Sequence, residues 1–102
     1  MKIFHNEEIY IKTDNFSDSI FKENTMFFDI ETTGFSPVKA IVYMIGCSRR
    51  IKNRIVIDQY FAESPDDEAA VIEAFAGSLS GCSTIVSFNG VGFDIPFLKN
   101  KY

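Results

Sequence analysis

Short runs of hydrophobic residues, many of them β-branched or aromatic, recur along the chain, a pattern typical of β-strands. The strongest predicted strand covers residues 25–31, where an apolar run contains one carboxylate, Asp29, and Glu31 follows directly. Because strand side chains alternate between faces, Asp29 and Glu31 share one face, with Cα atoms about 7 Å apart. Apolar residues occur on both faces at the start of this stretch, which predicts a strand covered on both sides and two poorly solvated carboxylates.

Three further strands are predicted from stretches rich in Ile, Val and aromatic residues, at 40–47, 54–61 and 83–88. The first two of these follow strand 25–31 through short connections, so we expect an antiparallel meander. Asn53 is placed in the left-handed conformation that a tight hairpin between them favours.

A helix is predicted over residues 65–80, with Ser64 as its N-cap, Pro65 as its first residue and Gly81 at its end. A second helix is expected over residues 93–102. The first helix carries one apolar stripe, formed by Val71, Ile72, Phe75 and Leu79. This stripe predicts that the helix covers one face of the sheet.

Residues 1–24 carry the weakest pattern, and we treat them as an N-terminal extension to a domain that spans residues 25–102. Within the extension, residues 9–11 are expected to form a short edge strand and residues 15–21 a helical turn. From residue 25 the predicted order is β-β-β-α-β-α. This order defines an α/β fold with a mixed sheet and helices packed on it.

Composition limits the classes of protein that the chain can belong to. A length of 102 residues allows one domain, and a net charge of −4 provides no overall basic field to attract nucleic acid. The two cysteines, Cys47 and Cys82, lie in no metal-binding motif and fit a reducing compartment. The apolar run at 40–45 is too short to span a bilayer. We therefore expect a cytoplasmic protein with no membrane partner.

Polar residues follow two predicted strands that the order places side by side. Asp29 and Glu31 end strand 25–31, while Asn89 and Asp94 come after strand 83–88. If these strands are parallel, their carboxyl ends share the edge of the sheet where ligands bind in open α/β folds. Three converging carboxylates suit Mg²⁺ or Mn²⁺. The alternative is that Asp94 is an ordinary acid at a helix start and that the other polar residues simply end strands.

The segment from Phe28 to Gly34, FDIETTG, resembles the first motif of the DEDD-type 3′–5′ exonucleases. These enzymes belong to the ribonuclease H-like superfamily and include the proofreading epsilon subunits. Asn89 with Phe93 and Asp94 resembles their second motif, and residues 87–98 are most similar to a predicted bacterial exonuclease branch. The resemblance covers roughly residues 25–102.

The resemblance implies a catalytic site with two divalent ions, Mg²⁺ or Mn²⁺, which hydrolyses phosphodiester bonds at the 3′ end of single-stranded DNA or RNA. Asp29, Glu31 and Asp94 would be the catalytic, metal-binding residues. The terminal nucleotide would be met by Thr32, Thr33, Gly34, Phe35, Asn89 and Phe93. For Phe93, packing in the core is an equally weighted alternative.

The sequence departs from the family pattern because the third motif is absent. That motif carries a His or Tyr general base and a fourth carboxylate, on a later helix than any in these 102 residues. We therefore expect the C-terminal part of the fold to be missing, little or no nuclease activity from this chain alone, and self-association through uncovered surfaces. The competing hypothesis is a non-catalytic ribonuclease H-like domain that binds nucleic acid or another partner.

Overall fold

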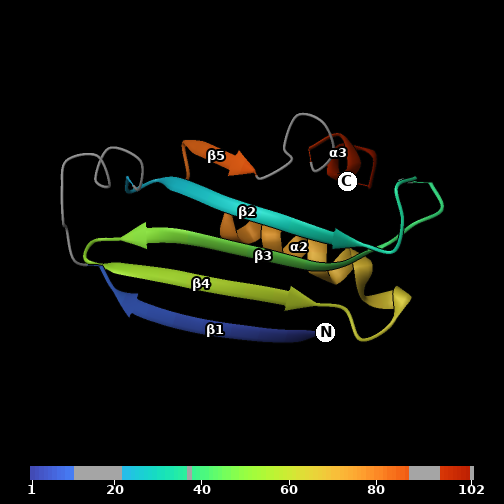
Figure 1. Ribbon diagram of the computed structural model, residues 1–102, viewed down its shortest axis with the longest axis horizontal. Coiled ribbons are helices and arrows are strands. Elements are labelled where there is room, and N and C mark those ends of the chain that lie inside the picture. Colours follow the sequence, from blue (N-terminus) through green and yellow to red (C-terminus); the bar gives the residue numbers. More distant parts are fainter. Residues whose placement is uncertain (11–21, 37, 88–94, 102) are drawn as a thin grey trace.

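A computed structural model describes residues 1–10, 22–36, 38–87 and 95–101, which form one five-stranded mixed sheet with helices packed against it (Figure 1). The strands are β1 (Lys2–Ile9), β2 (Thr25–Thr32), β3 (Val42–Ile51), β4 (Arg54–Phe61) and β5 (Thr84–Ser87). Their spatial order is β1-β4-β3-β2-β5, and only β2 and β5 are parallel neighbours. The predicted α/β class and mixed sheet are confirmed.

The predicted meander is confirmed as β2, β3 and β4, and the bounds of β4 match the prediction. The hairpin between β3 and β4 differs in one residue. Its left-handed residue is Lys52, with φ of 55°, and not Asn53. The backbone N–H of Lys52 donates to a carboxylate oxygen of Glu23 at 2.7 Å, which holds the hairpin against the segment that precedes β2.

The strand β1 is the largest departure from the predicted order. It pairs antiparallel with β4 along all eight of its residues, whereas the sequence predicted only a short strand at residues 9–11. The sequence does not predict β1 because all its side chains are exposed to solvent and neither of its faces is apolar. A period of two therefore never appears in this stretch. The helical turn predicted at residues 15–21 lies outside the described residues.

The predicted helix at 65–80 consists of a single 3₁₀ turn, η1 (Pro65–Asp67), followed by α2 (Glu68–Ser78). Ser64 is the N-cap residue of this turn and Pro65 is its first residue, as predicted, but the Ser64 side chain makes no cap bond. The Asp67 carboxylate instead accepts a bond from the backbone N–H of Glu63 at 3.0 Å. Gly81 has φ of 83°, which glycine adopts at no steric cost, just beyond the end of this helix.

One face of the sheet carries the core. Val71, Ile72 and Phe75 of α2 are buried, and the Phe75 ring lies 4.9 Å from the Phe28 ring. Leu79 is partly buried at the edge of the same cluster, so the predicted apolar stripe is confirmed. The last helix, α3 (Ile95–Lys101), contributes Phe97, which is 2% exposed. Figure 1 shows α2 behind the strands, on the far side of the sheet.

The opposite face of the sheet, here called the open face, has no helix over it among the described residues. On β2, Phe27 is half-buried, while Asp29 and Glu31 are exposed. The prediction that this strand is covered on both sides is therefore wrong for the part of the chain that the structure describes. Asp29 and Glu31 lie in solvent, not in a low-dielectric interior.

Candidate metal centre

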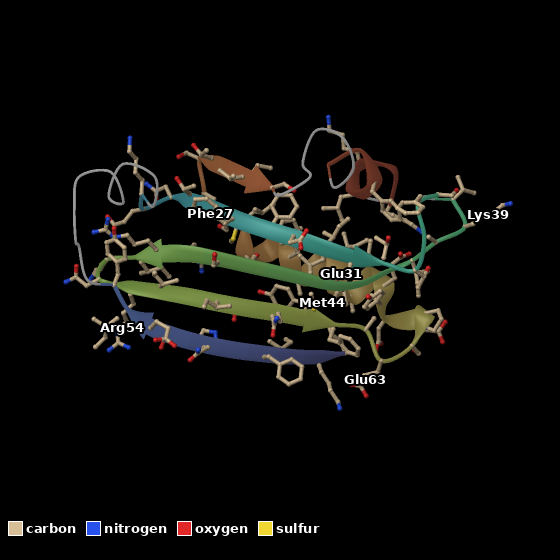
Figure 2. The ribbon with its side chains drawn as sticks, in the orientation of Figure 1. Phe27, Glu31, Lys39, Met44, Arg54 and Glu63 are labelled. Atoms are coloured by element: carbon tan, nitrogen blue, oxygen red, sulfur yellow. The ribbon has the colours of Figure 1, made fainter. Side chains whose placement is uncertain are left out.

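The carboxylates of Asp29 and Glu31 occupy the open face near the carboxyl end of β2. Asp29 lies opposite Gly46 of β3. Glu31 lies opposite Met44, and both of these residues are labelled in Figure 2. Gly46 brings no side chain over the strand, and even an added Cβ would meet no atom closer than 3.9 Å. Asp29 therefore has free space above its neighbouring strand.

A shallow hollow of about 710 Å³ lies on the open face beside Asp29. Its other lining residues come from four strands and include Phe27, Met44, Ser48, Gln59 and Val86. The hollow is apolar at Phe27 and Val86, and its only carboxylate among the described residues is Asp29. A ligand with both an apolar and a cationic or metal-bound part fits these surroundings.

The parallel pairing of β2 with β5 places the end of β5 beside the candidate centre. The last residue of β5, Ser87, lies opposite Phe28, so β5 ends one position before Asp29. Asn89, Phe93 and Asp94 follow along the chain but lie outside the described residues. Their convergence on Asp29 and Glu31 stays a prediction, although α3 begins at Ile95, directly after Asp94.

The predicted nucleotide-contacting loop begins at a bulge between Glu31 and Thr32. The hydroxyl of Thr32 donates to the carbonyl oxygen of Gly34 at 2.5 Å. The hydroxyl of Thr33 accepts the N–H of Ile41 at 3.0 Å, and the Thr33 N–H donates back to the Ile41 carbonyl at 3.0 Å. Both threonine hydroxyls therefore hold the base of the loop in a defined shape.

Two other residues of the loop differ in their surroundings and exposure. Gly34 lies close to Ala40, where an added Cβ would come within 3.4 Å of the alanine side chain. Phe35 is 91% exposed at the tip of the loop. A phenyl ring with that exposure gains from any apolar or aromatic surface that a ligand brings to it.

Glu68 is a positioning residue that the sequence analysis did not single out. One of its carboxylate oxygens accepts the backbone N–H of Val42 at 2.6 Å, and the other lies 3.3 Å from the Lys101 amino group. Glu68 and Lys101 are only 19% and 14% exposed. The first residue of α2 therefore joins the start of β3 to the end of α3. The local sequence does not predict that Glu68 joins β3 to α3, because an acid at a helix start is common.

The two described carboxylates fit a hard cation in chemistry, since ionised Asp and Glu offer oxygen acceptors only. The side chains of Asp29 and Glu31 form no hydrogen bond or ion pair with any other of the described residues. No group of three metal-ligating side chains occurs within the described ranges. A complete centre therefore needs at least one ligand from outside them, and Asp94 is the predicted one.

The fold and these residues agree with the comparisons. A family model for the RNase H superfamily matches residues 26–102, so the chain belongs to that superfamily. The matched segment starts at β2 and leaves β1 outside it. Members of this superfamily generally act on nucleic acids as hydrolytic nucleases. The match is to the superfamily as a whole and not to an exonuclease branch of it.

One curated relative is the uncharacterized protein YprB of Bacillus subtilis (strain 168), which is 29% identical over 82 residues. The alignment covers 79% of this chain and 20% of YprB, so the chain spans about a fifth of that relative's length. No solved structure matches the chain. None of the helices in the described parts of the chain is long and apolar enough to cross a membrane.

Proposed function

We propose that this chain carries the metal-binding part of a 3′–5′ exonuclease, with Asp29 and Glu31 as ligands and Asp94 as the third. The observation that supports it most is the placement of Asp29 and Glu31. They lie together on the open face, at the end of a strand whose parallel neighbour leads into Asn89 and Asp94. Ligand sites in open α/β sheets favour this position.

Bound Mg²⁺ or Mn²⁺ would supply activation of a water molecule and neutralisation of the phosphate charge. Asp29 and Glu31 would provide the negative oxygen atoms that hold the ions close to the sheet. The two threonines would fix the loop above them, as their bonds to Gly34 and Ile41 indicate. Phe35 would contact the terminal base or sugar of a single strand, DNA or RNA. Asn89 and Phe93 would position the strand end.

The rival function is a non-catalytic ribonuclease H-like domain that binds nucleic acid. It is favoured by the surroundings of Asp29, where the described residues place no group able to act as a general base. The only histidine, His5, lies on β1, separated from β2 by two strands. It also faces the helix side of the sheet, because it bonds Asp58 there.

Metal binding and hydrolysis are tested separately. Mn²⁺ binding to residues 1–102 is measured by electron paramagnetic resonance for the wild type, Asp29→Asn and the control Asp66→Asn, which changes an exposed acid of η1. We expect Asp29→Asn to weaken binding at least about tenfold, and Asp66→Asn to leave it unchanged. Equal binding by all three would refute the centre.

Hydrolysis is then followed on single-stranded DNA and RNA labelled at the 5′ end, with Mn²⁺ present. Stepwise shortening from the 3′ end by a chain that contains the third motif, and its loss in Asp29→Asn, is the expected result. Metal binding without hydrolysis by that longer chain would favour the non-catalytic domain. Blocking the 3′ hydroxyl separates exonuclease from endonuclease action.

A further inference from the structure

The outer edge of β1 is an unusual surface for a folded domain. β1 is an edge strand of the sheet, and it pairs with β4 on one side only (Figure 1). Nothing among the described residues pairs with its other side. All eight residues are exposed, including Ile3 at 56% and Ile9 at 75%. An open edge of this kind is a template for pairing with another strand.

The backbone groups available at this edge follow from the register of β1 with β4. Ile9 lies opposite Arg54, and the Tyr10 N–H donates to the Asn53 carbonyl at 2.6 Å, which makes Tyr10 and Asn53 a hydrogen-bonded pair. Such pairs alternate along an antiparallel ladder. The even-numbered residues therefore bond β4. The outward N–H and C=O groups belong to Ile3, His5, Glu7 and Ile9.

We propose that β1 pairs antiparallel with β1 of a second copy of this chain, around a two-fold axis at Asn6. In this register the outward-pointing residues face one another, as an antiparallel ladder requires. Ile3 lies opposite Ile9 of the second copy, and His5 lies opposite Glu7. Each of these pairs occurs twice because of the symmetry.

Side-chain chemistry favours this register over the nearest alternative that keeps the ladder. The proposed pairing joins two exposed isoleucines and places an imidazole beside a carboxylate. Centring the axis on His5 would instead place two histidines face to face and set Ile3 opposite Glu7. The His5 ring already bonds Asp58 at 2.5 Å, which favours its charged form, so two such rings would repel each other.

The pairing leaves the candidate metal centre uncovered. Asp29 and Glu31 lie on β2, and β4 and β3 separate that strand from β1. Pairing along β1 would make one continuous sheet from the two five-stranded sheets, with both open faces on the same side. The inference is independent of the proposed nuclease function, because it uses no residue of the centre.

Sedimentation equilibrium over a range of protein concentrations tests the association itself. We expect a monomer–dimer equilibrium that Ile9→Lys weakens about tenfold or more, since two equivalent apolar pairs are lost. Phe4→Lys is the matched control, because Phe4 is a similarly exposed residue of β1 at 55% that would lie opposite Glu8 of the second copy. Circular dichroism checks that both variants remain folded.

Disulfide trapping tests the register. In Asn6→Cys, the two new thiols would lie directly opposite each other in a non-hydrogen-bonded pair, with Cα atoms about 4.5 Å apart, which a disulfide can span. In Glu8→Cys the two thiols would be displaced by about 13 Å along the strands. Oxidation should cross-link the first variant and not the second.

Three results would overturn the inference. They are a monomer at every concentration, a dimer that Ile9→Lys leaves intact, and cross-linking of Glu8→Cys to the same extent as Asn6→Cys.

Discussion

Replacing Phe75 by alanine removes the ring by which α2 packs on Phe28 of the sheet. The side chain is 5% exposed, and its ring is tilted by 42° against the Phe28 ring at 4.9 Å. A buried Phe→Ala change costs about 3–5 kcal/mol, including the cavity that remains. About 0.5–1.5 kcal/mol of that loss belongs to the ring pair itself.

This cost is large for a domain of 102 residues, because native proteins are stable by only about 5–15 kcal/mol. Equilibrium unfolding in urea is the suitable assay, followed by far-ultraviolet circular dichroism because the chain has no tryptophan. With a denaturant dependence of about 2 kcal/mol per molar urea, the midpoint should fall by about 1.5–2.5 M.

Phe35→Ala is the matched control, since it removes the same ring from a position that is 91% exposed. Its cost should stay below about 0.5 kcal/mol. If Phe75→Ala cost less than about 1 kcal/mol, or no more than the control, α2 would not be the main cover of the sheet.

Two further predictions concern single contacts. Glu68→Gln should destabilise the fold by about 1–3 kcal/mol, because the buried Val42 N–H loses a charged acceptor, while Glu73→Gln on the exposed side of α2 should cost less than about 0.5 kcal/mol. Urea denaturation of both variants measures this, and equal costs would contradict it. The hydrogen bond from His5 to Asp58 raises the pKa of the imidazole above its usual value. Its stabilising effect is therefore complete below the unfolded pKa of about 6.5 and disappears as the pH rises through the folded pKa. The difference in unfolding midpoint between the wild type and His5→Gln should shrink from acidic to alkaline pH, and a difference that grows would refute the assignment.

The meander and α2 were predictable because their signals are local. The strands at 25–31 and 54–61 are short runs rich in β-branched and aromatic residues, and α2 carries its apolar stripe, since each element must bury a face against the core. The strand β1 was not predictable in this way, because both of its faces are solvated. Its position is determined by pairing with β4, whose sequence lies far along the chain.

The candidate centre was likewise predictable only in part. Alternation along β2 correctly predicted that Asp29 and Glu31 share a face. Their solvation was predicted wrongly, because strand composition does not determine what lies above that face. The interaction of Glu68 with Val42 and Lys101 was invisible for a related reason, since it joins three segments distant in sequence.

Helix α2 contacts the elements on both sides of the candidate centre. Beneath β2, Phe75 packs on Phe28, the residue before Asp29. At its first residue, Glu68 is bonded to Lys101 of α3, the helix that begins directly after Asp94. Both sides of the proposed site are therefore attached to the same short helix. A metal centre needs its ligands held within about 0.5 Å of the productive geometry, and such placement comes from packed elements behind the ligands. For this chain, the order of the centre depends on the helix side of the sheet, while its ligands and substrate lie on the open face.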